Sequence, residues 1–433
     1  MKIEISREIE RFGPIKIHGV QKVFELDGGL KNADNDEEYN PIMQRIAYDI
    51  QHEIQEQMAI VVPVRNEKIK LIEGVLSGIP HHCQVIIVSN SPREPMDRFK
   101  LEKDAIEHIG RFMNRKFLVV HQKDPVLTKA VEASGYKHLL DKKGSIKNGK
   151  AEGMILSTML AYLCGKKYVG FIDSDNYFPG AVLEYVQEYC AGFFLSASPY
   201  TMVRISWHSK PKVVESNLFF AKRGRASEHT NRILNRLISY YTGYGTEIIK
   251  TGNAGEHALT MEMAMQLDYS SGYSIEPYHY VNVLERYGGI LAPPSDKVMK
   301  EGVEFFQIES RNPHLHEVKG DEHVKDMSLA AMEVIYHSPI CPPALKANIL
   351  EDVHNRKLLK KEEDIESKLH YYPALYSADF KKFKEELKNE EYAPLFVQDV
   401  SKYTPSEKDK KLMRDTKAAK IREIPKEGKL EVK

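Results

Sequence analysis

Two carboxylates separated by one residue, Asp173 and Asp175, follow directly after the apolar run Tyr168–Ile172. If the chain stays extended at this point, both side chains point the same way. Carboxylate oxygens bind hard divalent cations, which in turn bind the phosphates of a substrate. The pair therefore predicts a metal and phosphate site. The plainer alternative is that either aspartate caps the next helix, with Pro179 in the first turn of that helix.

Two histidines with the same spacing, His314 and His316, lie far along the chain beside a proline. In an extended segment their imidazoles share a face and could bind one metal, or a metal and a phosphate. Taken alone, they are better explained as surface histidines. Taken with Asp173 and Asp175, they favour Mg²⁺ or Mn²⁺ held partly by substrate oxygens.

Three further polar clusters could surround a nucleotide. Asn66 and Glu67 follow an apolar run, and could bind a ribose or a base edge or cap the following helix. Ser89 and Asn90 follow the next run, where a turn is the plainer interpretation. Lys150, preceded by a glycine at a predicted helix start, could hold phosphate through amides, helix dipole and ammonium. The chain lacks both the P-loop and the Gly-x-Gly-x-x-Gly patterns, which argues against ordinary NTPases and dinucleotide enzymes.

Alternating strands and helices must position these residues. Apolar runs predict strands, and helical periodicity between them predicts helices. Such alternation favours right-handed crossovers and a mainly parallel, open α/β sheet, which binds ligands at its carboxyl edge. The predicted strands are Met58–Pro63, Gln84–Asn90, Lys116–His121, Tyr168–Ile172, Gly192–Ala197, Thr201–Trp207 and Phe305–Glu309. The predicted helices are one ending at Leu76, then Leu101–Met113, Ala151–Leu163, Gly180–Tyr189, Asn231–Tyr241, Ala258–Leu267, Pro277–Arg286 and Glu322–Tyr336.

Composition limits the partners and the compartment. At 433 residues the chain can form one large α/β domain with additions, or two domains. Lys plus Arg equals Asp plus Glu, at 62 each, so no charge excess points to nucleic acid. The four cysteines are scattered, without a Cys-x-x-Cys pair, which fits a reducing cytoplasm. Because no apolar stretch of about 18 residues occurs, we expect a soluble, cytoplasmic protein without a membrane partner.

Ten short blocks of sequence, which occur in the same order as in the family, resemble mannosyl-3-phosphoglycerate synthases over roughly residues 10–345. The resemblance implies a GT-A glycosyltransferase fold and transfer of mannose from GDP-mannose to 3-phospho-D-glycerate with retention. It also implies a divalent cation, Mg²⁺, Mn²⁺ or Co²⁺, and a product that is the precursor of the compatible solute mannosylglycerate. The blocks are Pro63–Glu67, Val88–Ser91, His121–Pro125, Gly149–Lys150, Gly170–Tyr177, Tyr200–Arg204, Lys210–Lys212, Thr251–His257, Gly272–Pro277 and Asn312–Glu317.

The same resemblance assigns roles to the donor side of the site. Asp173 and Asp175 would be the acidic motif, with Asp175 as the catalytic metal ligand and Ser174 where the family commonly has alanine. His314 would be the histidine ligand, ahead of His316. The GDP-mannose pocket would be lined by Pro63, Asn66, Glu67, Ser89, Asn90, Lys123, Lys150, Asp173 and Ser174.

The acceptor needs fixed cations, because 3-phosphoglycerate carries both a phosphate and a carboxylate. Arg204, Lys210 and Lys212 are the candidates, with Arg311 beside the histidines and Asn253 in the glycine-rich loop. The alternative for the basic residues after position 207 is a solvated loop.

Glu256 would lie closest to the hydroxyls of the transferred sugar. Attack of the acceptor hydroxyl on the face that GDP leaves would give retention without a protein nucleophile, and a double displacement through Glu256 stays open. The rival functions are a glucosyl-3-phosphoglycerate synthase with an NDP-glucose donor, a nucleotidyltransferase, and a non-catalytic sugar-nucleotide-binding protein. A nucleotidyltransferase would need an N-terminal phosphate loop, which the sequence lacks.

We divide the chain into four regions. Residues 1–50 would form a peripheral strand or hairpin from Ile15–Leu26 and a loop at Asp27–Tyr39. Residues 51–200 would bind the nucleotide sugar, and residues 201–350 would complete the acceptor and metal sites. Residues 351–433 would be a charged helical extension and tail. The oligomeric state stays open, with a homodimer as one option.

Overall fold

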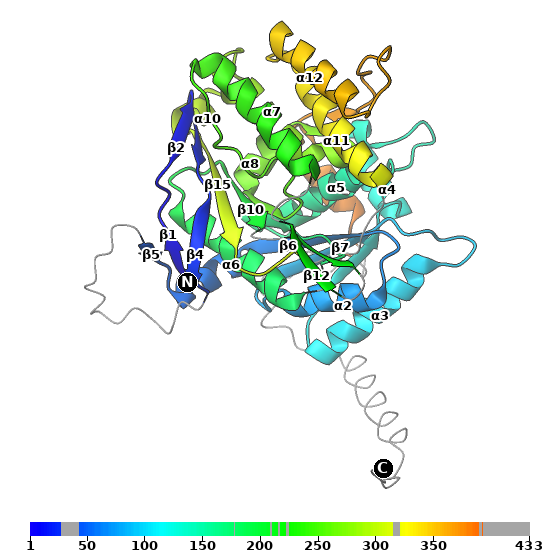
Figure 1. The fold of residues 1–433 in the computed structure, drawn as a ribbon. Helices are drawn as coiled ribbons and strands as arrows, with labels where there is room; N and C mark the ends of the chain where they lie inside the picture. Colours follow the sequence, from blue (N-terminus) through cyan, green and yellow to red (C-terminus); the bar gives the residue numbers. More distant parts are fainter. Residues whose placement is uncertain are drawn as a thin grey trace, which may run out of the picture.

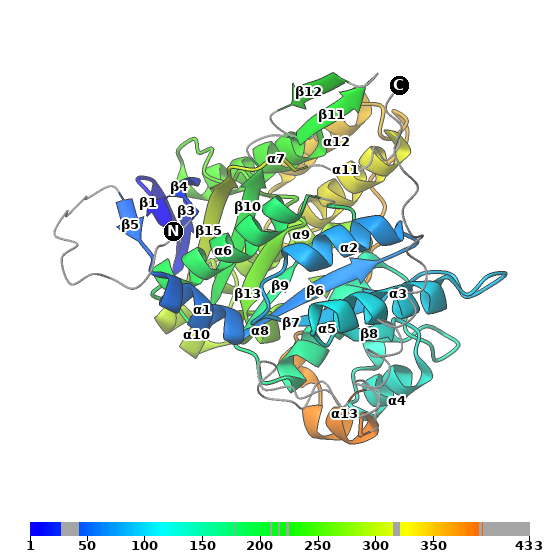
Figure 2. The ribbon, with the colours of Figure 1, turned by 90° about the horizontal axis from the view of Figure 1, so that it is seen from below.

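The computed structural model describes residues 1–26, 43–176, 178–207, 210–214, 217–221, 225–314, 321–388 and 392. One large sheet runs through the protein, with helices on both of its faces (Figures 1 and 2). The loop predicted at Asp27–Tyr39 and the tail from Ser401 lie outside the described residues.

The strands of the large sheet follow the order β5-β1-β4-β15-β10-β13-β9-β6-β7-β8, and β3 pairs with both β2 and β15. A separate pair joins β11 to β12, and another joins β14 to β16. The bounds are β1 Lys2–Glu4, β2 Ile9–Phe12, β3 Ile15–His18, β4 Gln21–Glu25, β5 Met43–Arg45, β6 Met58–Val64, β7 Gln84–Ser89, β8 Leu118–His121, β9 Tyr168–Phe171, β10 Thr201–Trp207, β11 Lys210–Val214, β12 Asn217–Ala221, β13 His257–Thr260, β14 Tyr269–Ser270, β15 Val303–Ser310 and β16 Tyr371–Tyr372.

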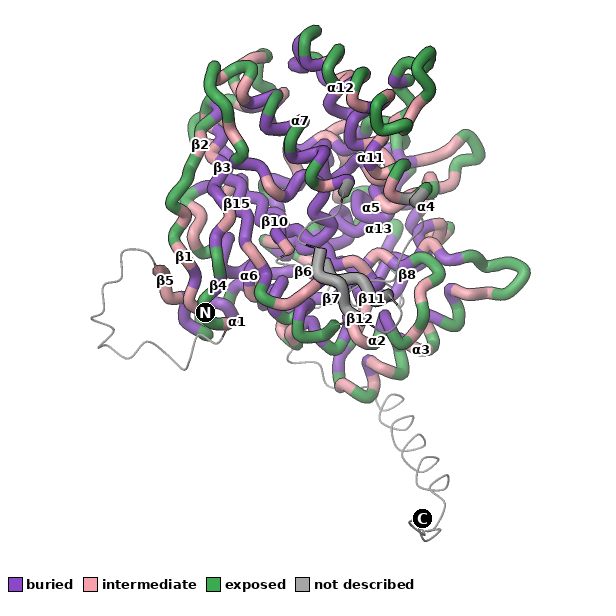
Figure 3. Tube along the Cα trace, in the orientation of Figure 1, coloured by how far each residue is buried: buried purple, intermediate pink, exposed green. Residues whose placement is uncertain are grey.

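A parallel block of four strands, β8-β7-β6-β9, confirms the predicted α/β class. Both faces of β6 are covered: Ile60 and Val62 are buried against helices on one face, and Ala59 and Val61 against helices on the other. This double burial explains the unbroken apolar run in the sequence. Each fully buried aliphatic side chain contributes about 1.5–3 kcal/mol, and Figure 3 shows the buried trace running through the strands.

The helices divide between the two faces according to the core that each one packs into. Helices α1 (Tyr48–Glu56), α2 (Ile69–Gly78), α3 (Arg98–Met113) and α6 (Pro179–Leu195) cover one face. The other core takes α4 (Pro125–Ala133), α5 (Lys150–Leu163), α7 (Arg225–Thr242), α8 (Met261–Gln266), α9 (Ile275–Tyr287), α10 (Asp296–Glu301), α11 (Asp321–Tyr336), α12 (Pro343–Asn355) and α13 (Phe380–Glu386). Single 3-10 turns are η1 (Lys137–Leu139), η2 (Gly272–Ser274) and η3 (Leu375–Ser377). None of the helices in the described part of the chain is long and apolar enough to cross a membrane.

The strand predicted at Gly192–Ala197 is wrong, because α6 continues to Leu195. Short apolar runs do not distinguish a strand from a buried helix segment by periodicity. The packing explains the glycine: a Cβ at Gly192 would lie 2.8 Å from Cγ1 of Val203 on β10. Helix α6 therefore lies directly on the sheet at this residue.

The helix predicted at Ala258–Leu267 begins three residues late, at Met261, because 257–260 form strand β13. This strand runs antiparallel between β9 and β10, with His257 opposite Phe171 and Arg204. The hydroxyl of Thr260 caps α8 by accepting from the Met263 N–H. One antiparallel strand thus interrupts the otherwise parallel middle of the sheet.

Three regions hold structure that the sequence did not predict in this form. Strands β3 and β4 pair in parallel with β15, so the N-terminal strands extend the large sheet. Residues 210–214 and 217–221 form the antiparallel pair β11–β12, where a loop was the alternative. Beyond α12, Tyr372 and Tyr392 are fully buried, so described residues of the C-terminal region belong to the core.

We expect Gly192→Ala to lower the free energy of unfolding by about 1–3 kcal/mol, the usual effect of overpacking a filled core. Urea denaturation measures this. Gly245→Ala is the matched control, since a Cβ at this exposed residue meets open space and should leave the unfolding midpoint almost unchanged. Equal midpoints for the two variants would contradict the close α6–β10 contact.

Candidate active site

Six strands end at the same edge of the sheet. Strands β6, β7, β8 and β9 run parallel, and β10 and β15 run the same way because β13 reverses direction between β9 and β10. The segments that follow them therefore meet at the carboxyl edge, where open α/β sheets bind ligands. These segments hold Asn66 and Glu67, Asn90, Lys123, Asp173 to Asp175, and the turn before His314.

Asp173 lies in a half-buried ion-pair cluster. The Lys150 ammonium lies 2.7 Å from Asp173 Oδ1 and 3.0 Å from Glu276 Oε1. Burial alone would lower the pKa of Lys150, but Asp173 and then Glu276 hold it well above its ordinary value. The lysine therefore keeps its positive charge at any working pH, beside the end of β9.

Neither aspartate caps a helix, so the N-cap alternative is wrong. The N-cap of α6 is Phe178, and Pro179 lies in its first turn as predicted. The same holds for the first loop, where the N-cap of α2 is Lys68 rather than Asn66 or Glu67.

Gly255 packs against Asp173 from the loop before β13. A Cβ at Gly255 would lie 2.6 Å from Asp173 Oδ2 and 3.4 Å from the Lys150 ammonium. A side chain here would push the loop away from the carboxylate. Glycine thus allows the 251–256 loop to close over the end of β9.

Glu256 and His314 form a second, deeper cluster. Glu256 is fully buried, and its Oε1 lies 3.9 Å from His314 Nδ1. His314 also approaches the Tyr185 hydroxyl, at 3.4 Å from Nδ1, and its ring lies 4.6 Å from the Trp207 ring. Burial, followed by the charge of Glu256, raises the pKa of Tyr185 well above its ordinary value, so this phenol stays protonated.

Glu184 on α6 fixes the turn that leads to His314. Its carboxylate accepts from the Arg311 N–H at 2.6 Å, and from the backbone and side-chain N–H groups of Asn312 at 2.8 and 2.6 Å. Glu184 is fully buried, and burying a charge is costly unless it is hydrogen-bonded in this way. Helix α6 thus positions His314 through Glu184 and contacts it through Tyr185.

A buried carboxylate also ties together the loops after β6 and β7. Glu102 accepts from the hydroxyls of Ser89 and Ser91, at 2.7 and 2.8 Å, and Ser91 Oγ accepts from the Asn66 N–H at 2.6 Å. Asn66 has a φ of +59°, a left-handed conformation that asparagine tolerates better than most residues. The Ser89 hydroxyl is buried and donates to Glu102. Ser89 therefore supports the loop from beneath, whereas it was predicted to line the pocket.

The start of α5 differs from the predicted phosphate cradle. Gly149 is the N-cap and has a φ of +150°, which only glycine adopts readily. The carboxylate of Glu152, on the same helix, folds back against Gly149 and accepts from the Tyr372 hydroxyl at 2.7 Å. An acid of the chain therefore lies where a phosphate was expected, and only the ammonium of Lys150 reaches the acidic edge.

Arg204 contradicts its predicted role as an acceptor ligand. Its side chain is fully buried and donates to the carbonyl oxygens of Thr251 at 2.9 Å, Gly252 at 3.3 Å and Glu276 at 3.1 Å. The guanidinium also lies over the Tyr280 ring, 4.8 Å from its centroid. Arg204 fixes the loop before β13 and cannot reach a solvent-borne anion.

Asn253, a predicted acceptor residue, is buried within that same loop. Neither its amide nitrogen nor its amide oxygen has a hydrogen-bond partner in the part of the chain that the structure describes. An unsatisfied buried polar group costs about 1–3 kcal/mol. A hydroxyl-rich ligand at this loop would recover that cost.

The structure describes the remaining predicted site residues to different extents. Arg311 is exposed, and its guanidinium donates to the Phe24 carbonyl oxygen at 2.7 Å. Lys210 and Lys212 lie on β11, but the structure does not describe their side chains, and His316 lies outside the described residues. Among the described residues, the ligand atoms of Asp173, Asp175 and His314 do not all lie within 4.8 Å of one another, so these three side chains do not form a closed metal site by themselves.

Four side chains that build this site, three acids and one phenol, have no role predicted from the sequence. Glu276 lies in the block Gly272–Pro277, but a sequence does not show its ion pair with Lys150. Glu102, Glu184 and Tyr185 lie inside helices. The only signal for Glu102 and Glu184 was a charged residue on the apolar face of a helix.

The α/β sheet, with the Asp-Ser-Asp motif at the carboxyl end of an interior strand, has the form of a GT-A-like glycosyltransferase. The family model described as mannosyl-3-phosphoglycerate synthase matches residues 5–387 of this chain. The chain belongs to this family.

Two relatives agree with this assignment. The mannosyl-3-phosphoglycerate synthase of Pyrococcus furiosus is 46% identical over 367 residues, covering 84% of this chain and 91% of that protein. The enzyme of the same name from Aeropyrum pernix is 35% identical over 365 residues, covering 83% and 92%.

A more distant likeness is to glucosyl-3-phosphoglycerate synthase from Mycobacterium tuberculosis, solved with Mn²⁺, UDP-glucose and phosphoglyceric acid. It has a TM-score of 0.46 and 16% identity, and covers 70% of this chain and 87% of that one. The family assignment does not depend on this likeness.

We expect Arg204→Ala to destabilise the protein, because each carbonyl that loses its donor costs about 1–3 kcal/mol when it stays buried. Urea denaturation measures the loss. Arg311→Ala, at an exposed arginine, is the control and should change the free energy of unfolding by no more than about 0.5 kcal/mol. A stable Arg204→Ala variant with only a raised acceptor KM would return Arg204 to the acceptor site.

Proposed function

We propose that this protein transfers mannose from GDP-mannose to 3-phospho-D-glycerate with retention, giving mannosyl-3-phosphoglycerate and GDP. The family match over residues 5–387 supports the reaction. The observation that carries the proposal structurally is the cluster at the end of β9, where Lys150 pairs with Asp173 within reach of the loop that holds Glu256.

A divalent cation fits this edge. Lys150, Asp173, Asp175 and Glu276 bring one formal positive charge and three negative ones to it. Magnesium-type ions are usually held by one or two carboxylates together with substrate phosphates and water, so a closed protein triad is not required. We assign Asp175 and His314 as the protein ligands, with Asp173 as a further candidate; His316, the other predicted ligand, lies outside the described residues. When bound, the ion neutralises the charge that develops on the departing diphosphate.

The donor nucleotide would lie over the ends of β6, β7 and β8. Pro63, Asn66, Glu67, Asn90 and Lys123 lie at or just after the carboxyl ends of these strands, and the Glu102 network holds the loops after β6 and β7 in place. A fixed pattern of polar groups rejects a wrong base, because the mismatched base leaves buried donors and acceptors unpaired. We propose guanine selection by Glu67 and Asn90 on this basis.

The acceptor would approach from the side of β10 and β15. Lys210 and Lys212 on β11 follow directly after β10, and Arg311 follows directly after β15. They offer cations for the phosphate and carboxylate of 3-phosphoglycerate. Arg204 would act on the acceptor only indirectly, because it holds the loop that carries Asn253.

Retention would follow from attack of the acceptor hydroxyl on the face that GDP leaves. Lys150 stays protonated and stabilises the negative charge that develops on the leaving group. Glu256 is buried beside His314, which suits a group that orients sugar hydroxyls. A double displacement through Glu256 is the alternative, and trapping of a mannosyl-enzyme would establish it.

Asp175→Asn should lower kcat by at least about a hundredfold, the scale on which removal of a preorganised charge acts. Treatment of the native protein with EDTA should cause a similar loss that Mg²⁺ or Mn²⁺ reverses. Asp104→Asn, at an exposed acid on α3, is the control and should keep full activity. Full activity of Asp175→Asn, or indifference to EDTA, would exclude the metal role.

GDP should raise Tm more than UDP does at equal concentration with Mg²⁺ present, because the loops after β6 and β7 select the base. Product analysis by NMR with 3-phosphoglycerate should give α-mannosyl product from GDP-mannose and far slower turnover of UDP-glucose. Equal stabilisation by the two nucleotides, together with preferred turnover of UDP-glucose, would support a glucosyl-3-phosphoglycerate synthase instead.

A further inference from the structure

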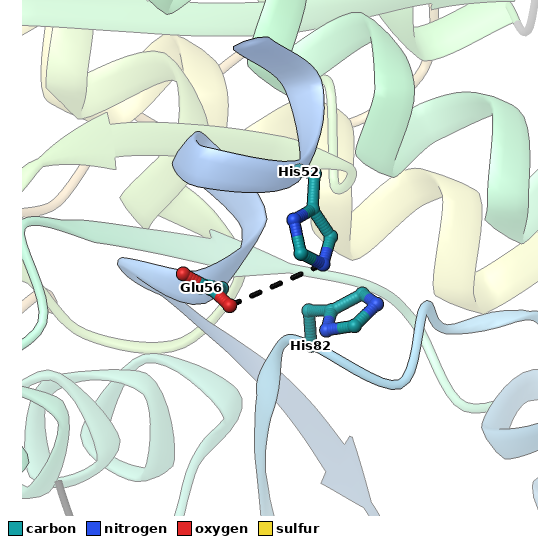
Figure 4. A group of neighbouring side chains, drawn as sticks. All are labelled: His52, Glu56 and His82. Carbon is teal, nitrogen blue, oxygen red and sulfur yellow. Dashed lines mark ion pairs between the residues drawn. The ribbon is translucent and has the colours of Figure 1, made fainter. Parts of the chain in front are cut away.

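Two histidines and a glutamate meet far from the acidic edge. His52 and Glu56 lie on consecutive turns of α1, and His82 lies in the turn before β7 (Figure 4). Their ligand atoms all lie within 4.8 Å of one another, and His52 Nε2 is 4.0 Å from Glu56 Oε1. The rings of His52 and His82 are in edge contact, with centroids 3.7 Å apart.

This group lies at the opposite edge of the sheet from Asp173. Helix α1 leads into β6 at Met58, and the turn of His82 leads into β7 at Gln84. Both positions are at the amino ends of parallel strands, whereas Asp173 follows the carboxyl end of β9. The group is therefore separate from the proposed catalytic cation.

The backbone beneath the group is rigid. Arg115 is buried, and its guanidinium donates to the carbonyl oxygens of Ile79, Pro80 and Cys83, each at 2.7 Å. On the other side, the Lys166 ammonium donates to the Glu56 carbonyl oxygen at 2.7 Å. Both segments are thus fixed in place, while the three side chains above them keep enough exposure to rotate.

The donor set suits a transition metal better than a hard cation. Imidazole nitrogens with one carboxylate are typical ligands of zinc and its neighbours. Metal–ligand bonds of about 2.0–2.1 Å in tetrahedral geometry place ligand atoms roughly 3.4 Å apart. The observed separation of 4.0 Å between His52 and Glu56 needs only a small rotation of two partly exposed side chains to reach that value. Water can fill the fourth position.

We propose that His52, Glu56 and His82 bind one divalent transition-metal ion of the zinc class, which links α1 to the turn before β7. Such an ion would join the segments that enter the two neighbouring strands β6 and β7. Its effect would be on stability, since it lies at the edge away from the donor and acceptor sites.

Zinc binding to the EDTA-dialysed full chain tests this. The native protein should bind one more equivalent of Zn²⁺ than His52→Ala or His82→Ala, and ZnCl₂ should raise the Tm of the native protein more than that of either variant. Any residual binding at this group should be weaker by at least about 10–100-fold, the loss known for less direct metal partners. Glu56→Gln should weaken the same equivalent.

His81→Ala is the matched control, because His81 is the exposed neighbour of His82 and is not part of the group. It should keep the additional equivalent. All four variants should keep their mannosyltransferase rate with Mg²⁺, which separates this ion from the catalytic one.

Unchanged zinc stoichiometry and affinity in His52→Ala and His82→Ala would overturn the proposal, as would an equal loss in His81→Ala. If a histidine variant fails to fold, Glu56→Gln decides, since this glutamate is exposed and its replacement leaves the helix intact.

Discussion

Strand β13 runs against its neighbours β9 and β10, and this direction decides which residues meet at the active edge. With His257 opposite Phe171, the residues just before β13 lie beside the residues just after β9. Gly255 therefore packs on Asp173, and Glu256 reaches the buried space beside His314. A parallel strand at the same place would have sent this loop to the opposite edge.

Buried charges hold this arrangement, and each is bonded on several sides. Arg204 binds three carbonyl oxygens, Glu184 accepts three N–H groups, and Glu102 accepts two hydroxyls. Isolated buried charges would be strongly unfavourable, so these groups favour only the conformation that satisfies them. They hold in place the loops that carry Asn66, Asn253 and His314.

The strands and helices of the parallel block could be predicted from the sequence, because their apolar runs are long and both faces are buried. The position of Asp173 and Asp175 at the carboxyl edge of the sheet could also be predicted, because it depends only on the order and direction of the strands. Gly192–Ala197 was wrongly predicted as a strand, and the start of the helix predicted at Ala258–Leu267 was placed inside β13, because short apolar runs fit a strand or a helix equally well. The role of Arg204 was missed, because a sequence shows that a residue is charged but not whether carbonyl groups surround it.

The order of the strands also determines when the fold can be completed during synthesis. Strands β6 to β9 lie within about 115 residues of one another and can pair early. Strands β3 and β4, made first, find their parallel partner only in β15, nearly 290 residues later. One edge of β3 and one edge of β4 thus stay unpaired until most of the chain has left the ribosome, and long-range pairing of this kind is slow. A chaperone that shields strand edges would act on this protein chiefly through its first 25 residues.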